Sequence, residues 1–110
     1  MERLEFVVLG SQGDEYRITF ERNEMNLNVF CTCAAGENRL YCKHRFALMN
    51  GEYERVIVGD EVKLARVKAV MQGTDLEQAY KGLVAADIVH AEAKRKLDIA
   101  KKLVAKAMYN

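Results

Sequence analysis

The sequence lacks the long apolar run that a membrane-spanning helix needs. Half of the 110 residues are hydrophobic, but no stretch approaches the roughly 20 consecutive apolar residues that cross a bilayer. The apolar residues occur instead in short periodic pieces, which is typical of a soluble globular domain. We therefore expect one domain over residues 1–110, with no membrane partner.

Cysteine is scarce, and none is spare. The chain has three cysteines, all between positions 31 and 42, so none remains to form a disulfide with a distant part of the chain. No basic and apolar leader stands at the N-terminus. These two absences argue against a secreted disulfide framework, and we expect a cytoplasmic protein.

The chain also has little net charge. A formal charge of +1 is far from that of a strongly basic nucleic-acid-binding domain. The charges are nevertheless separated along the chain. Residues 1–30 carry three arginines against six acids, whereas residues 87–110 carry six bases against three acids. This separation into an acidic first part and a basic last part can form an electrostatic footprint for nucleic acid.

Three segments near the N-terminus predict an antiparallel β-sheet. Residues 4–9 form a strand that stops at turn-forming residues 10–14, and residues 16–20 alternate cleanly between apolar and polar side chains. A third strand begins near Asn26, and if it continues through Cys33 it places Leu27, Val29, Cys31 and Cys33 on one face. A sheet of about three strands with one apolar face needs a cover, which the later helices can supply.

A group of metal-ligating residue types lies in the middle of the chain. Cys31 and Cys33 form a Cys-x-Cys pair, and eight residues separate them from the Cys-x-His pair Cys42 and His44. Four such ligands in two close pairs suit tetrahedral Zn²⁺. We predict that they bind one Zn²⁺ ion at the junction between a strand and a helix. Gly36, between the two pairs, is expected to adopt a positive φ.

Alternative roles for these cysteines and this histidine fit the sequence less well. Iron–sulfur clusters usually take more thiolates or a pair of histidines, and merely buried cysteines would not gather within twelve positions beside a histidine. A catalytic zinc keeps a vacant coordination position. Cys42 and His44 do not fit a nucleophile pair, because residues two apart on a helix point in nearly opposite directions. We therefore expect a closed structural site and no enzymatic activity.

The pattern of ligands resembles the SWIM-type zinc finger. The likeness covers about residues 16–50 and includes the aromatic and β-branched strands before Cys31 and the apolar residues 46–49 after His44. The resemblance implies that Cys31, Cys33, Cys42 and His44 are the zinc ligands. It also implies binding to DNA or to proteins, usually as an accessory of larger ATPases, transposases or kinases.

The second half of the chain predicts helices over about residues 60–108. A helix of about two turns follows Cys42 and stops at Asn50-Gly51, while residues 56–58 fit a short buried strand or an apolar connection. A further helix runs from Asp60 to Gln72 and ends at Gly73. The sequence Thr74-Asp75-Leu76-Glu77 then has the form of a capping box that opens the last helix, which Gly82 can bend.

The last helix carries a heptad pattern. One seam position holds Leu83, His90, Leu97 and Val104, and the other holds Ala86, Ala93, Ala100 and Ala107. Small residues at every second seam position allow another helix to approach closely. The partner is the helix of residues 60–72, the underside of the sheet or a copy of the same helix in a homodimer. An antiparallel intramolecular pair is the default.

Two groups of basic residues are candidate contacts for nucleic acid. Arg39, Lys43 and Arg45 lie beside the metal ligands, and Lys94, Arg95, Lys101 and Lys102 lie on the last helix. The helix bases form a solvated face by default, and the alternative is that each neutralises a phosphate and releases counterions.

These patterns together predict an α+β fold in which an antiparallel sheet leads through a zinc-stabilised junction to C-terminal helices. The favoured function is a zinc-binding recognition module for nucleic acid, DNA in particular. The alternative is an adaptor for another protein or a homo-oligomerising accessory protein.

Overall fold

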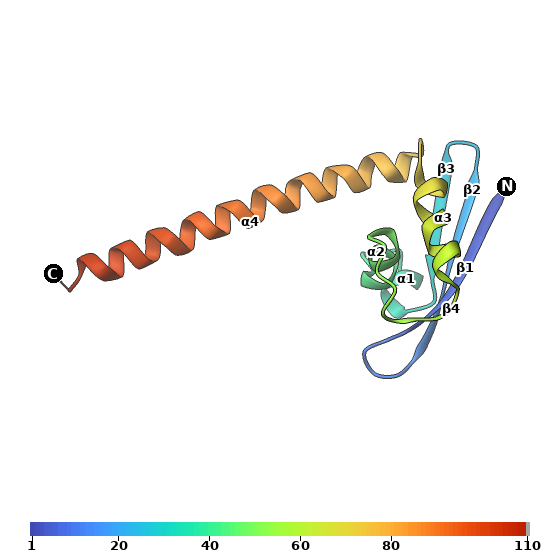
Figure 1. Ribbon diagram of the computed structural model, residues 1–110, viewed down its shortest axis with the longest axis horizontal. Coiled ribbons are helices and arrows are strands. Elements are labelled where there is room, and N and C mark those ends of the chain that lie inside the picture. Colours follow the sequence, from blue (N-terminus) through green and yellow to red (C-terminus); the bar gives the residue numbers. More distant parts are fainter. Residues whose placement is uncertain (110) are drawn as a thin grey trace. The chain divides into compact units, whose positions relative to one another are not determined.

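The computed structural model describes residues 1–109 and confirms the predicted α+β class (Figure 1). The helices and strands follow one another in the order β1 (Glu2–Leu9), β2 (Glu15–Asn23), β3 (Asn26–Cys31), α1 (Ala34–Glu37), α2 (Lys43–Met49), β4 (Val56–Val58), α3 (Glu61–Met71) and α4 (Asp75–Ala107). By its internal contacts the chain divides into a compact unit of residues 1–77 and a second unit that begins at Gln78.

The sheet has four strands, one more than predicted. Its order is β3-β2-β1-β4, and every neighbouring pair is antiparallel. The extra strand is β4, the segment for which the sequence favoured neither a strand nor a connection. It pairs with β1 opposite Val7 and Val8. Ile57 and Val58 of this edge strand are exposed, so the apolar run of residues 56–58 did not indicate a buried strand.

One face of the sheet forms the core of the first unit, as the alternation predicted. Phe6 and Phe20 are fully buried and meet edge to face, with 6.0 Å between their ring centroids. The cover comes from α2 and α3, whose buried residues are Leu48, Met49, Val67, Val70 and Met71. Burying a large apolar side chain stabilises a fold by about 1.5–3 kcal/mol, so this core does not depend on a metal ion alone.

Arg22 of β2 joins the sheet to the end of α3. Its guanidinium donates to the carbonyl oxygens of Val70 at 3.1 Å and Gln72 at 2.7 Å, and also to that of Glu24 at 2.8 Å. The last carbonyls of a helix have no partner within the helix and carry partial negative charge. Arg22 therefore caps α3 and fixes this helix against the strand.

We expect Arg22→Ala to lower the free energy of unfolding of the first unit by about 1–3 kcal/mol, since it leaves these carbonyls without a charged donor. Urea unfolding of the two proteins measures the difference. Arg3→Ala is the matched control because the Arg3 side chain is exposed in its ion pairs with Glu5 and Glu21, and ion pairs at the surface contribute little. Equal losses in both variants would contradict a capping role for Arg22.

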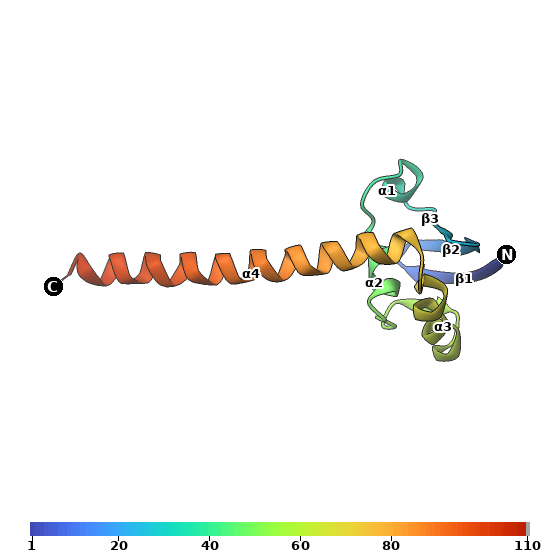
Figure 2. The ribbon, with the colours of Figure 1, turned by 90° about the horizontal axis from the view of Figure 1, so that it is seen from above.

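The helix α4 is continuous from Asp75 to Ala107, and Gly82 does not interrupt it (Figure 2). Thr74 and Glu77 open it in a variant of the predicted capping box, because the amide of Thr74 itself donates to the carbonyl of Met71. The Thr74 hydroxyl accepts from the Glu77 amide, while the Glu77 carboxylate accepts from the amide of Gly73. Within the described residues 1–109, no helix has both the length and the apolar character that spanning a membrane requires.

Candidate metal centre

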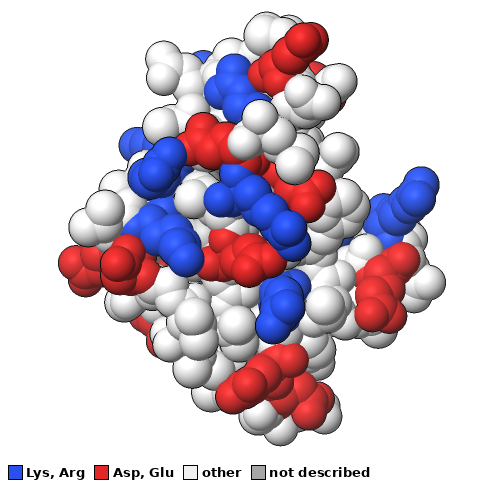
Figure 3. Space-filling model, turned by 90° about the vertical axis from the view of Figure 1, so that its right-hand side faces the viewer, with Lys and Arg blue, Asp and Glu red and all other residues white. Residues whose placement is uncertain are grey.

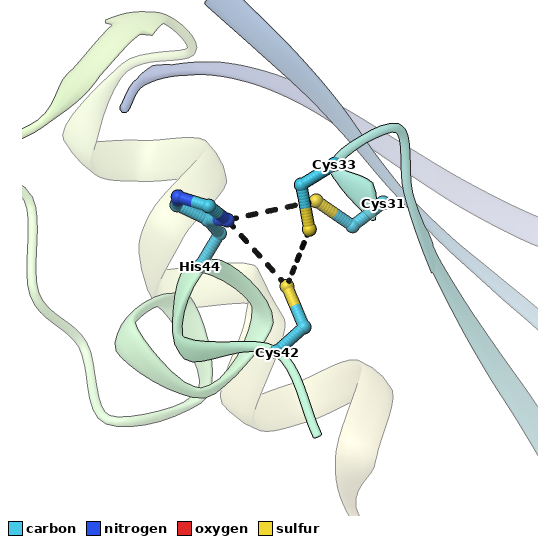
Figure 4. A group of neighbouring side chains, drawn as sticks. All are labelled: Cys31, Cys33, Cys42 and His44. Carbon is cyan, nitrogen blue, oxygen red and sulfur yellow. Dashed lines mark hydrogen bonds between the residues drawn. The ribbon is translucent and has the colours of Figure 1, made fainter. Parts of the chain in front are cut away.

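Four side chains converge where β3 leads into α1 and α2 (Figure 4). Cys31 is the last residue of β3, Cys33 precedes the first turn of α1, Cys42 precedes α2, and His44 lies in the first turn of α2. Each offers one ligand atom, and these atoms all lie within 4.8 Å of one another. The structure therefore brings together all four predicted metal ligands.

The spacing of the ligand atoms suits a single ion at their centre. The distance between the Sγ atoms of Cys33 and Cys42 is 3.4 Å, and Nδ1 of His44 lies 3.6 Å from Sγ of Cys42 and 3.9 Å from Sγ of Cys31. A tetrahedral ion with metal–sulfur bonds of about 2.3 Å separates its ligands by about 3.8 Å. The four residues can hold a metal ion through three sulfurs and one imidazole nitrogen.

Burial and a backbone donor shape the sulfur positions. Cys31, Cys33 and Cys42 are 4%, 6% and 2% exposed, so the ligand set is closed to solvent on most sides. The amide of Gly36 donates to Sγ of Cys33 at 3.2 Å. Such a bond favours the thiolate that a metal ion requires.

The prediction that Gly36 adopts a positive φ is wrong. Gly36 is not among the glycines with positive φ. A Cβ at this position would instead lie 2.5 Å from the carbonyl oxygen of Cys31 and 2.7 Å from its Cβ. The turn between the ligands folds back onto the end of β3, and only a residue without a side chain fits there.

The pKa values of the cluster residues are shifted in different directions. Burial raises the pKa of the Cys31 thiol to about 12. Burial also acts to raise the pKa of Cys42, but backbone and thiol hydrogen bonds, led by the amide of Arg45, outweigh it and lower this pKa. The pKa of His44 is lowered by burial and by the neighbouring charges of Lys43 and Arg55. The neutral imidazole is the form that ligates metals.

Two residues that sequence reasoning did not assign to the site support it. The ring of Tyr16 on β2 lies against His44, with 4.8 Å between centroids. Arg45 donates to the carbonyl of Val29 at 2.9 Å and also to that of Leu40, which ties α2 to β3 and to the loop before Cys42. The alternation along β2 already placed Tyr16 on the inward face of the sheet. Nothing in the sequence indicated which carbonyls Arg45 contacts.

Comparison of the chain with family models, with curated proteins and with solved structures found no match.

The structure separates the three bases predicted beside the metal. Arg39 and Arg45 line a groove of about 720 Å³ next to Cys31. Lys43 lines a different cavity of about 330 Å³, together with His44 and Arg55. On α4, the four predicted contacts are all exposed, namely Lys94, Arg95, Lys101 and Lys102.

The aromatic residues near the metal are also placed differently from one another. Tyr41 is 67% exposed and stacks on Phe46, with 4.3 Å between centroids and 18° between ring planes. Phe30, which the sequence did not single out, is 52% exposed on β3 and lines the same groove as Arg39.

Proposed function

We propose that the chain is a structural zinc-binding recognition module of the SWIM type that binds single-stranded nucleic acid, DNA in particular. The observation that carries the proposal is the groove beside the metal centre, which combines an exposed aromatic ring with arginines. Four protein ligands would fill a tetrahedral ion and leave no position for a substrate, so the proposal includes no catalysis.

Zinc is the ion that the ligand set favours. Three thiolates and one imidazole in a tetrahedral arrangement are typical of structural Zn²⁺ sites. Calcium and magnesium prefer oxygen ligands, and none of the four side chains offers oxygen. The SWIM assignment draws support from the ligand spacing and from the strand that ends at Cys31.

The groove offers two kinds of contact to a nucleic-acid strand. Phe30 stands on the outward face of β3, opposite Thr19 on β2, where its ring can stack on a base. Arg17 and Arg39 are both exposed and line the same groove, where each can neutralise a phosphate. Arg45 has two of its donors bound to backbone carbonyls, so we assign it mainly to positioning.

The charge on one side of the molecule favours local contact over a broad basic field. Lysines and arginines are interspersed with aspartates and glutamates over the side of the molecule drawn in Figure 3. Arg3, for example, pairs with Glu5 at 2.9 Å and with Glu21 at 3.7 Å. Binding to duplex DNA is strengthened by a wide basic surface that contacts many phosphates, whereas a single strand presents unpaired bases for stacking. The mixed charge on this side therefore favours a single strand.

The affinity for single-stranded DNA should fall by about 5- to 150-fold in Phe30→Ala, because one stacked base contributes about 1–3 kcal/mol. Fluorescence anisotropy with a labelled oligonucleotide of mixed sequence at low salt measures this change. Tyr109→Ala removes an aromatic ring that is 89% exposed at the far end of the chain and should leave the affinity unchanged. No binding by the unaltered chain at low salt would overturn the proposed function.

The same titration repeated at several salt concentrations separates the groove from the α4 bases. Contacts by Arg17 and Arg39 alone correspond to a slope of log K against log salt of about −1.4 for a single strand. Four more contacts from α4 would steepen the slope by about 3. Replacing Lys94, Arg95, Lys101 and Lys102 by glutamine removes that increment if those residues bind phosphate.

A further inference from the structure

The helix α4 exposes a long apolar stripe. Within Asp75–Ala107 it has no buried residue, and every residue from 81 to 107 is exposed. Leu97 and Val104 are 54% and 56% exposed, and Leu83 is 43% exposed. Single exposed apolar residues are ordinary, but a continuous stripe of them is the mark of an interaction surface.

Residue size alternates along this stripe. Larger side chains recur every seven residues, at Leu76, Leu83, His90, Leu97 and Val104, of which Leu76 is half-buried. Alanines recur with the same period between them, at Ala79, Ala86, Ala93, Ala100 and Ala107. A period of seven in a helix defines a seam for a left-handed pair of helices. The continuous α4 extends the seam by one heptad beyond the pattern that residues 83–107 display.

We propose that α4 pairs with α4 of a second copy of this chain in an antiparallel homodimer. In a parallel pair in register, each alanine would face its own copy and each larger residue would face its own copy. Layers of two alanines would then alternate with layers of two larger residues, and no single distance between the helices would suit both. An antiparallel pair places each larger residue against an alanine, which gives layers of uniform thickness.

The length of the seam sets the register of the pair. With the two-fold axis between residues 91 and 92, all ten seam residues are used, because each contact from one chain is repeated from the other. The contacts from one chain to the second copy are Leu76 to Ala107, Leu83 to Ala100, His90 to Ala93, Leu97 to Ala86 and Val104 to Ala79.

The charges beside the seam support the same orientation and register. In this register Asp87 faces Lys94 of the second copy, and the symmetry repeats the pair. A shift of one heptad in either direction places Lys94 against Lys94 or Asp87 against Asp87. A parallel pair would place Lys96 against Lys101 twice and would leave Asp87 opposite Gly82. Interactions of like charges are unfavourable and select against such pairings.

The pairing would use the charge of Asp87, which α4 itself does not neutralise at helical spacing. The residues three and four positions away are Leu83, Val84, His90 and Ala91, none of them a lysine or arginine. Lys96, in contrast, already pairs with Glu92 at 3.6 Å. The helix is about 50 Å long at 1.5 Å per residue. In an antiparallel pair the starts of the two copies of α4 would lie at opposite ends of the helix pair.

Two charge variants of the full chain test the proposal. Asp87→Lys and Lys94→Asp should each raise the dimer dissociation constant at least about tenfold, because each puts like charges together twice. Mixed in equal amounts, the two variants should form a heterodimer in preference to either homodimer, since both pairs are then opposite in charge. Native mass spectrometry of the mixture, with one variant isotopically labelled, measures the three species.

Asp98→Lys and Lys102→Asp form the matched control, because these residues lie away from the seam on the same exposed helix. Their mixture should show no preference, and circular dichroism should report unchanged helix content in all four variants. Weak protein pairs are populated at a concentration of about 10⁻⁴ M. A chain that is strictly monomeric at that concentration would overturn the proposal. A dimer in which the Asp87 and Lys94 variants mix at random would overturn the antiparallel register. None of these readouts involves nucleic acid, so they are independent of the proposed function.

Discussion

Replacing Cys42 by serine should release the metal ion and melt the junction where β3, α1 and α2 meet. Sγ of Cys42 lies within hydrogen-bonding distance of both Cys33 and His44, and the residue is almost fully buried. Binding of a structural zinc ion contributes on the order of 10 kcal/mol in small zinc-binding domains. That contribution is comparable to the entire stability of an ordinary domain. Native mass spectrometry measures the metal content, and the near-ultraviolet signal of the tyrosines follows thermal unfolding.

Lys43→Ser provides the control for this substitution. Lys43 stands between two ligands in the sequence, but its side chain is exposed, so the variant should keep one equivalent of metal and a melting temperature near that of the unaltered chain. A Cys42→Ser variant that retained one equivalent of metal and melted at the same temperature would contradict a structural metal site.

Adding a single methyl group at Gly36 should also disrupt the centre. In Gly36→Ala the new Cβ would lie 2.5 Å from the carbonyl oxygen of Cys31, and this neighbour is backbone that cannot rotate away. The turn must shift, and with it the amide that donates to Sγ of Cys33. Loss of such supporting interactions typically lowers metal affinity by about 10- to 100-fold. Competition for the metal with a chromophoric chelator measures the affinity.

Gly82→Ala is a matched substitution that should stabilise the protein instead of disrupting it. A Cβ at Gly82 would meet no atom within 4 Å, and α4 continues through this residue. Alanine stabilises a helix interior by about 1 kcal/mol relative to glycine. Gly82→Ala should therefore raise the helix content of α4 on heating, as circular dichroism reports, without changing the metal affinity. An equal metal affinity in the Gly36→Ala variant and the unaltered chain would show that the close approach to Cys31 is not a constraint.

Much of the first unit could be predicted because its signals are local. The alternation of Tyr16, Ile18 and Phe20 placed β2, and the ligand pairs placed the metal centre on a strand end and a helix start. The helix boundaries at Asp60, Gly73 and Thr74 followed from capping chemistry, and the side chains of Asp60 and Thr74 accept the expected amide hydrogen bonds. These features depend on residues a few positions apart.

Other features depended on contacts between distant residues. The three apolar residues of β4 gave no clean period, and their pairing with β1 decides that they form a strand. The sequence carried no signal for Arg22, and Arg45 was predicted as a nucleic-acid contact, yet both donate to backbone carbonyls of residues distant in the sequence. Phe30 carried no functional signal in the sequence, because one outward aromatic residue on a strand is common. Its place in a groove with Arg17 and Arg39 depends on the turn that follows Cys33.

The sequence alone determined which four side chains can bind a metal, because their types and spacing suit almost no role except metal binding, and it determined the heptad seam of α4. The tertiary structure decided that the four ligand atoms lie within 4.8 Å of one another, and that Phe30, Arg17 and Arg39 line one groove. Both outcomes depend on how segments far apart in the chain meet in space. The spacing of residues along the chain restricts which of these contacts are possible but does not determine which of them form.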